Sequence, residues 1–347
     1  MKFLALEPSS QRQQLRFCTV YWMIMLRNPE IESLAEGILA GDRMSLSQGI
    51  TLLESTLEAD QETSERLLSS LLPKTDTALR VAVTGAPGVG KSTFIEALGM
   101  HLVESGNKVA VLTIDPSSPR TGGSILGDKT RMPRLAKHPD SFIRPSPSGT
   151  VTGGLAHATR STILLCNAAG YNPILVETVG TGQGEYTARQ TVDVVLLLVL
   201  AHAGDELQGI KRGILETADL IAVSKADGPL KERASLTAKT YRRALALSPS
   251  RSVIPKVMIS SALENTGIAD IWDAIKEFEH TARKNGQLDQ RRHEQIKFAI
   301  FEAAKELFLT RFSRSEDLQH ELQQLQKQVI QGECTVNKAA HILLRDL

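Results

Sequence analysis

Residues 79–104 read LRVAVTGAPGVGKSTFIEALGMHLVE, and this stretch decides the class of fold. The apolar run Val81–Val83 predicts a buried strand, and Gly85–Ser92 (GAPGVGKS) fits the pattern G-x-x-x-x-G-K-[ST]. Phe94 and Leu98 then recur at the spacing of an amphipathic helix. A strand, a glycine-rich turn and a helix in this order predict a phosphate-binding loop, the P-loop.

The chemistry of phosphate binding explains these residue types. Glycines let backbone N–H groups approach phosphate oxygens with no Cβ in the way, and the helix N-terminus adds partial positive charge. We expect Lys91 to contact the β- and γ-phosphates and to act in catalysis, and the Ser92 hydroxyl to bind Mg²⁺. A chance match in a glycine turn is the alternative, but the flanking strand and helix argue against it. The expected nucleotide contacts here are Gly85, Ala86, Pro87, Gly88, Val89, Gly90, Lys91, Ser92 and Thr93.

Further strands are expected on both sides of this motif. They are short and nearly continuous apolar runs, as expected for strands covered on both faces: Leu79–Thr84, Lys108–Ile114, Pro173–Thr178, Val192–Leu200, Leu220–Ser224 and Ile254–Ser260. Their alternation with helical patterns predicts an α/β fold with a doubly wound, mostly parallel sheet. Between Asp115 and Arg160 the chain is rich in Pro, Gly and Ser, so a long irregular segment is expected there.

Helical extensions are predicted on either side of the P-loop domain, to which we assign residues 77–280. Residues 29–76 should form an arm of three short helices, and residues 281–347 a C-terminal helical segment. Residues 1–28 are an extension of uncertain status. We expect the chain therefore to consist of one nucleotide-binding domain with helical additions at both ends.

Two details of these extensions can be predicted. The arm is expected to break at Gly41-Asp42 and at Ala59-Asp60. In the C-terminal segment one helical stripe carries four apolar residues, which suit either an intramolecular packing face or a dimer seam: Leu318, Leu322, Leu325 and Val329.

The base of the nucleotide is indicated by a second motif. Ser224-Lys225-Ala226-Asp227 follows a predicted strand, where most P-loop GTPases have N-K-x-D. The Asp227 carboxylate can accept two hydrogen bonds from the guanine ring N–H and amino group, and the Lys225 stem can cover the base. Ser224 stands in place of asparagine and offers one hydroxyl without the reach of an amide. One strand later, Ser261-Ala262-Leu263 is expected to contact the guanine oxygen through its backbone.

Acidic residues close two other strands. Asp115 ends one and Glu177 another, and open parallel sheets place ligands beyond the carboxyl ends of their strands. We therefore expect both carboxylates near the phosphates and Mg²⁺, and Asp128, in the loop between them, as a third acid. A helix cap or a surface ion pair is the alternative for each.

Three further residues are candidates for reading or cleaving the γ-phosphate. Gly180 would place a backbone N–H near it, and Gln183 could orient the attacking water. Lys211 lies in the glycine-bounded stretch Ala203–Lys211 and could supply charge to the transition state, although an ordinary surface lysine is an equal reading. No general base is evident, and phosphoryl transfer needs little beyond positioning and charge neutralisation.

Composition excludes several classes of protein. Of 347 residues, 41% are hydrophobic and 23% charged, which suits a globular chain rather than a disordered one. Lys and Arg total 40 against 39 Asp and Glu, so the net charge gives no pull toward nucleic acid or an anionic membrane. The three cysteines, Cys18, Cys166 and Cys334, form no C-x-x-C pair, which argues against a disulfide scaffold or a zinc ribbon.

The first 28 residues are relevant to the cellular compartment of the protein. No apolar run reaches the roughly 18 residues of a membrane span, and no small-residue cleavage site follows the apolar core Phe17–Leu26. We expect a cytoplasmic protein. The mitochondrial matrix is the alternative if residues 1–28 are a presequence.

Three longer stretches carry a family resemblance. They are DPSSPRTGGSILGDKTRM at 115–132, ETVGTGQGE at 177–185 and GDELQGIKRG at 204–213. With the P-loop, they resemble the methylmalonyl-CoA mutase-associated GTPases of the MeaB/ArgK family, from about Pro29 to the C-terminus. Two departures are Ser224 in place of asparagine and Ala201-His202 where the family commonly has Pro-Gly.

This resemblance implies an N-terminal helical arm, a central GTPase domain and a C-terminal segment that forms a homodimer. It implies binding of GTP and GDP with Mg²⁺, and GTP hydrolysis that gates adenosylcobalamin loading and protection of an acyl-CoA mutase such as methylmalonyl-CoA mutase. Asp115, Asp128 and Glu177 fall on the family's magnesium-side acids, and Asp205–Lys211 on its extra switch loop.

Two other functions remain open at this stage. A metal-insertion GTPase would share the nucleotide domain, but such proteins usually carry Cys/His clusters, which this chain lacks. A P-loop kinase acting on a protein or transport component would need an acceptor pocket with a catalytic base, and the sequence shows none.

Overall fold

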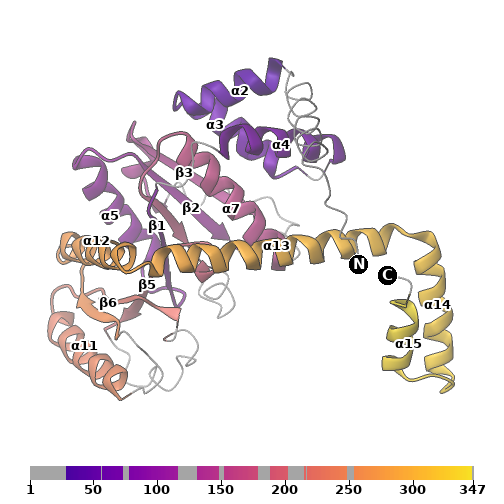
Figure 1. Cartoon of the computed structure of the whole chain (residues 1–347). Helices are drawn as coiled ribbons and strands as arrows, with labels where there is room; N and C mark the ends of the chain where they lie inside the picture. Colours follow the sequence, from indigo (N-terminus) through magenta and orange to yellow (C-terminus); the bar gives the residue numbers. More distant parts are fainter. Residues whose placement is uncertain are drawn as a thin grey trace, which may run out of the picture.

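A seven-stranded sheet forms the centre of the molecule, with helices on both faces (Figure 1). The computed structural model describes residues 29–55, 57–72, 78–115, 131–147, 152–178, 188–201, 215, 217–247 and 254–345. In chain order the strands are β1 (Arg80–Gly85), β2 (Val109–Asp115), β3 (Ser141–Pro147), β4 (Ile174–Glu177), β5 (Val194–Leu200), β6 (Leu220–Ser224) and β7 (Lys256–Ile259).

The strand order is β3-β2-β4-β1-β5-β6-β7, and every pairing is parallel. The chain starts in the middle of the sheet at β1, runs outward to β2 and β3, returns through β4 and then builds the other half. The predicted α/β fold with a doubly wound sheet is confirmed.

The helices form layers on the sheet and extensions beyond it. Their bounds are α2 (Pro29–Leu39), α3 (Arg43–Leu53), α4 (Glu58–Leu71), α5 (Lys91–Glu104), α7 (Thr152–Ala168), α11 (Leu230–Ala246), α12 (Ile268–Lys284), α13 (Gln287–Arg314), α14 (Glu316–Ile330) and α15 (Val336–Leu343). No helix in the described ranges is long and apolar enough to cross a membrane.

Alternate residues of the central strands pack against different layers, because successive side chains of a strand point to opposite faces. In β5, Leu196 and Leu198 join the core under α5 and α12. On the other face, Val195 packs in the core that includes α7, and Leu197 packs in the core that includes α11. The strands are therefore apolar on both sides, as their sequences predict.

The segment between Asp115 and Arg160 is more regular than expected. It contains β3, the 3-10 turn η2 (Leu135–Lys137) and the first half of α7. Pro145 and Pro147 make β3 unlike a strand in sequence. The structure tolerates them because β3 lies at the edge of the sheet and pairs on one side only.

The helical arm contains three short helices, but its second break is not where the sequence suggests. The first break, at Gly41-Asp42, is confirmed, and Asp42 caps α3 by accepting a hydrogen bond from the Ser45 backbone N–H. Ala59 and Asp60 instead lie in the first turn of α4, which begins at Glu58. Acidic residues favour the positive N-terminal end of a helix, so Asp60 starts a helix here rather than ending one.

The arm packs on α7 through a continuous apolar core. Ile38, Leu46, Ile50 and Leu67 are fully buried there together with Leu165. Arg144 of β3 adds an ion pair to Glu54, next to the end of α3. Apolar burial of this extent is the main force that attaches the arm to the sheet domain.

The C-terminal helices leave the sheet domain. Figure 1 shows α13 running past the domain and projecting beyond it to α14 and α15. On the predicted stripe, Leu325 is buried and Leu318, Leu322 and Val329 are half-buried, and α14 contacts α13 and α15. The stripe thus packs within the chain, which is the first of the two alternatives.

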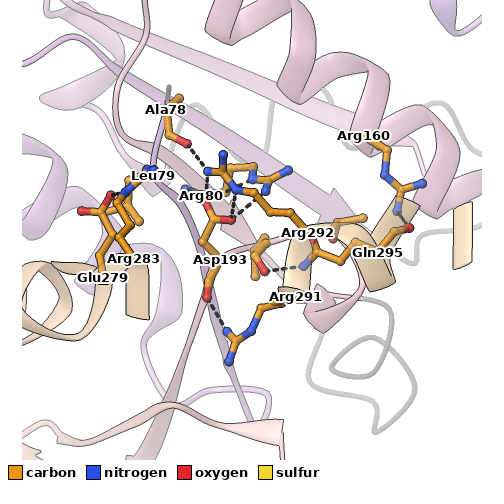
Figure 2. A network of polar contacts seen from close by, with 12 residues as sticks. Ala78, Leu79, Arg80, Arg160, Asp193, Glu279, Arg283, Arg291, Arg292 and Gln295 are labelled. Atoms are coloured by element: carbon orange, nitrogen blue, oxygen red, sulfur yellow. Dashed lines mark hydrogen bonds and ion pairs between the residues drawn. The ribbon is translucent and has the colours of Figure 1, made fainter. Parts of the chain in front are cut away.

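A buried carboxylate holds the root of α13 to the sheet. Asp193, directly before β5, is 0% exposed and accepts hydrogen bonds of 2.6–3.1 Å from the backbone N–H and guanidinium of Arg80 and from the guanidinium of Arg292 (Figure 2). Burial acts to raise the pKa of the Asp193 carboxyl. The hydrogen bonds and charges of Arg292 and Arg80 outweigh it and hold this pKa below its usual value.

Two more α13 side chains complete this attachment. Arg291 donates to both carboxylate oxygens of Asp219, at 2.9 Å each. Gln295 Nε2 donates to the carbonyls of Arg189 (2.9 Å) and Val192 (2.7 Å). The first turns of α13 are therefore bonded to residues at the starts of β1, β5 and β6.

We predict that Asp193→Asn lowers the free energy of unfolding by about 3–5 kcal/mol, because two guanidinium groups that are only 15% and 10% exposed lose their buried counter-ion. The carboxylate has a lowered pKa in the folded state, so its contribution is present above the unfolded pKa near 4 and is lost as pH falls through the folded value. Urea unfolding at pH 7 and at decreasing pH measures both effects.

Asp273→Asn is the matched control, since its side chain is 70% exposed and pairs with Lys276 one turn away. It should change stability by less than about 0.5 kcal/mol. Equal losses in the two variants would contradict the role given to Asp193.

Candidate functional site

The P-loop lies at the carboxyl end of β1, between β4 and β5. Gly85 has φ +147°, and a Cβ on it would lie 2.4 Å from the Leu198 carbonyl oxygen, so only glycine fits there. Gly90 has φ +97° and is the N-cap of α5. The loop therefore delivers the N-terminus of a 14-residue helix to the edge of the sheet, which is a favourable place for phosphate.

Lys91 folds back over this loop. Its Nζ donates to the carbonyl oxygens of Gly85 (2.9 Å) and Ala86 (3.3 Å). The ammonium is thereby held over the loop backbone, where its charge can serve phosphate oxygens.

Ser92 forms a hydrogen bond with one of the predicted acidic residues. Its Oγ donates to Glu177 Oε1 at 2.8 Å, although the two residues are 85 positions apart in the sequence. The register of β1 and β4 explains this approach, because Val83 pairs with Glu177 at the end of β4. Glu177 is 9% exposed. A hydroxyl and a carboxylate are oxygen donors of the kind that Mg²⁺ prefers, so the residues present fit this ion.

The other predicted phosphate-side residues are only partly described. Asp115 is the last residue of β2, and β2 is the neighbour of β4, with Thr113 paired to Glu177. The backbone of Asp115 thus ends beside Glu177 at the same edge of the sheet. Asp128, Gly180, Gln183 and Lys211 lie outside the described residues.

A cavity of about 230 Å³ opens beside the P-loop, at the ends of β6 and β7. All parts of the predicted base site line it except Ser261: Ser224, Lys225, Asp227, Ala262 and Leu263. It is also lined by Ser260, Thr93 and Phe94. The structure therefore brings the two sequence motifs together around one cavity whose other wall is the P-loop.

Side chains from the base motif are bonded to their surroundings. Lys225, with φ +56°, donates from Nζ to the Gly88 carbonyl at 2.8 Å, so its stem spans from β6 to the P-loop. Asp227 Oδ1 accepts from Ser261 Oγ at 3.0 Å. Ser261 in turn accepts from the Glu264 N–H and pairs by its backbone with Thr266. These contacts fix the Asp227 carboxylate at the cavity.

Ser224 makes contacts within the protein that its sequence context does not predict. Its Oγ is within donor distance of the Val89 carbonyl (2.9 Å) and the Val199 carbonyl (3.1 Å), and the residue is 5% exposed. A hydroxyl has a single hydrogen, so that hydrogen is used inside the protein. Because the C=O and N–H of a trans peptide point in opposite directions, holding Val89 O toward β6 turns the Gly90 N–H away from it. When its hydrogen is donated to the Val89 carbonyl, the shorter of the two contacts, Ser224 supports the conformation of the P-loop.

Ser260 was not predicted as part of the site. It follows β7 directly and lies beside Ser224, because Val223 pairs with Ile259 in the sheet. The signal available in the sequence is its place at a strand end, one residue before Ser261-Ala262-Leu263. Serine is too common at such positions to single it out.

Comparison with known proteins decides the family. The family model described as "Methylmalonyl Co-A mutase-associated GTPase MeaB" matches residues 46–317, most of the chain. The chain belongs to the MeaB family of GTPases.

Relatives in this family extend over nearly the whole chain. A probable GTPase of Mycobacterium tuberculosis is 45% identical over 316 residues, which are 90% of this chain and 94% of the relative. The GTPase ArgK of Escherichia coli is 44% identical and covers 82% of this chain and 88% of its own. A mouse protein named methylmalonic aciduria type A homolog, mitochondrial, is 38% identical over 91% of this chain and 79% of its own.

One solved structure is also similar. The crystal structure titled LAO/AO transport system kinase matches with a TM-score of 0.74 and 34% sequence identity, covering 92% of this chain and 98% of that chain. The MeaB-family fold of the sheet domain and its helices is therefore shared with an experimental structure over nearly the full length.

In this MeaB-family GTPase we predict that Asp227→Asn relaxes the preference for guanine, because an amide cannot accept both guanine N–H groups. The dissociation constant of GDP relative to that of ADP, measured by calorimetry, should rise by about tenfold or more, which corresponds to the loss of a charged hydrogen bond. Asp270→Asn, an exposed acid in the first turn of α12, is the control. An unchanged ratio in Asp227→Asn would show that Ser224–Asp227 does not read the base.

Proposed function

We propose that the protein binds and hydrolyses GTP with Mg²⁺, and that this cycle gates adenosylcobalamin loading and protection of an acyl-CoA mutase such as methylmalonyl-CoA mutase. The contact between Ser92 and Glu177 carries the nucleotide part of the proposal, since it joins a hydroxyl and a carboxylate at the mouth of the P-loop. The names of the family and of the mouse relative support the mutase part.

Each element of the site has a task in this proposal. Lys91 and the P-loop N–H groups bind the phosphates, and Asp227 with Lys225, Ser261, Ala262 and Leu263 holds the base. Ser92 and Glu177, joined by Asp115 and Asp128, would hold Mg²⁺, which neutralises charge on the phosphates.

The remaining assignments concern hydrolysis. Gly180 is proposed to sense the γ-phosphate, Gln183 to orient the attacking water and Lys211 to supply positive charge in the transition state. All three follow strands that end at the site, β4 for the first two and β5 for the third.

A kinase is the alternative that one finding favours, because the similar solved structure is titled a transport system kinase. Transfer to an acceptor would need a second binding site beside the γ-phosphate. The described cavity lies at the base end of the P-loop instead. A metal-insertion GTPase remains the third reading of the same nucleotide domain.

The proposed assembly is a homodimer formed through α13. Its exposed apolar residues include Ile296, Ile300 and Leu307, which recur at i, i+4 and i+11 and so lie along one side of the helix, and Phe301 and Phe308 lie on an adjacent stripe. Ile300 and Phe301 are 65% and 66% exposed. A second copy of the chain, with the same apolar face, is the partner that the family resemblance implies.

For location we propose the cytoplasm. The relatives from M. tuberculosis and E. coli are bacterial, whereas the mouse relative is named mitochondrial. Residues 1–28 lie outside the described residues, and the mitochondrial matrix stays the alternative.

The gating proposal predicts that loading of adenosylcobalamin depends on the bound nucleotide. Purified protein is mixed with a cofactor-free methylmalonyl-CoA mutase, and transfer of the cofactor is followed by visible absorbance with GTP, a non-hydrolysable GTP analogue or GDP. The loading rate should differ between GTP and its analogue. Lys91→Ala, which should lose nucleotide binding, is the control, and rates equal in all conditions would refute the gating function.

The dimer proposal predicts that Ile300→Glu gives a monomer in light scattering at micromolar concentration, because a charge in an apolar seam is costly to bury. Gln290→Glu, an exposed change at the root of the same helix, should leave a dimer. A dimer in both variants would place the interface elsewhere, and a monomeric wild type would contradict the homodimer itself.

A further inference from the structure

The base cavity contains a hydroxyl that the predicted guanine motif does not use. Ser260 is 2% exposed and lines the cavity. Among the described residues its Oγ has no hydrogen-bond partner. A buried polar atom without a partner is unfavourable, and in a native structure it indicates a ligand or a water that completes the bond.

The backbone of Ser260 is firmly placed. Its N–H donates to the Val223 carbonyl at 2.8 Å, and its carbonyl accepts from the Ala226 N–H at 3.1 Å. These two bonds hold Ser260 to the end of β6 and to the turn that follows it, on either side of Ser224. The side chain is therefore positioned by the sheet and by the turn that carries Asp227.

The serines Ser224 and Ser260 lie side by side at the ends of β6 and β7, but their hydroxyls differ in hydrogen bonding. The hydrogen of Ser224 is used by the Val89 or Val199 carbonyl, as described above. The hydrogen of Ser260 is available for a ligand in the cavity. The residue in the asparagine position thus uses its donor inside the protein, and Ser260, directly after the neighbouring strand, holds an unused donor.

A donor at this place suits guanine. In the proposed pose the guanine N–H groups face Asp227, so the acceptors O6 and N7 face elsewhere in the cavity. Guanine presents O6 as an acceptor where adenine presents an amino group, so a donor near this edge favours guanine. A hydroxyl can donate, and a cavity of about 230 Å³ has room for a bridging water beside the base.

We propose that Ser260 is a specificity-determining residue of the nucleotide site, whose hydroxyl donates to the O6 edge of guanine directly or through one water. This rests on the proposed function, which places a guanine nucleotide in the cavity. In this proposal, the selectivity for guanine that an asparagine at position 224 would supply comes from a residue directly after the adjacent strand β7.

The test compares Ser260→Ala with wild type in calorimetric titrations of GDP and ADP. Loss of one hydrogen bond should weaken GDP binding by about three- to tenfold and leave ADP binding unchanged. The diphosphate of 2-aminopurine riboside, which keeps the 2-amino group and lacks O6, should bind both proteins equally. Ser260→Thr keeps the hydroxyl and should retain the preference for GDP over ADP.

Thr159→Val is the matched control, because Thr159 Oγ1 is another buried hydroxyl without a partner among the described residues and lies on α7, outside the lining of the cavity. It should not change GDP binding. An unchanged GDP affinity in Ser260→Ala, or an equal loss for GDP and ADP, would overturn the proposal.

The nucleotide selectivity of the wild type distinguishes a failure of the proposed guanine site from a failure of the role proposed for Ser260. A wild type that binds GDP and ADP equally contradicts both the guanine site and the role of Ser260. A GDP-selective wild type with an unaffected Ser260→Ala variant contradicts the role of Ser260 alone.

Discussion

The bond between the Asp193 carboxylate and the guanidinium groups of Arg80 and Arg292 is the contact on which the arrangement of the chain depends. It joins the starts of β1 and β5 to the first turn of α13 through a carboxylate that is fully buried. The carboxyl ends of these same strands carry the P-loop and the segment that follows β5. The helix that leaves the domain and the nucleotide loop are therefore attached to opposite ends of β1.

At the other end of the sheet, the backbone carbonyls of the P-loop are contacted by two side chains of the base motif and by one lysine of the loop itself. Ser224 Oγ lies within donor distance of the Val89 carbonyl, Lys225 donates to the Gly88 carbonyl, and Lys91 donates to the Gly85 carbonyl. The loop that receives the phosphates is thus braced by the motif that surrounds the base cavity. A change at the base motif should therefore also affect phosphate binding, because its side chains contact the carbonyls of the peptides whose N–H groups face the phosphates.

Local sequence predicted the parts of the structure that depend on local physics. The P-loop, the apolar strands and the first break of the arm each follow from residues close together in the chain. Edge strand β3 was missed because Pro145 and Pro147 argue against a strand unless its place in the sheet is known. The second break of the arm was misplaced because an aspartate suits the start of a helix as well as a turn.

The contacts of the candidate site likewise divide into those that the sequence predicts and those that depend on tertiary structure. Glu177 could be predicted because a parallel sheet gathers its ligands at the carboxyl ends of strands, and its contact with Ser92 agrees with that rule. The bonding of Ser224 and Ser260 could not be predicted, because it depends on the register of β6 and β7 and on how close β6 comes to the P-loop. The partners of Asp193 lie up to 113 positions away along the chain, so no local pattern reveals them.

The most direct test of the account is the Mg²⁺-dependent turnover of GTP and ATP by the purified protein, with and without an adenosylcobalamin-dependent acyl-CoA mutase from the same source. The account predicts slow turnover that is selective for GTP and rises when the mutase is added. Equal turnover of ATP and GTP would contradict the guanine site, and GTP turnover that is indifferent to the mutase would contradict the proposed partner.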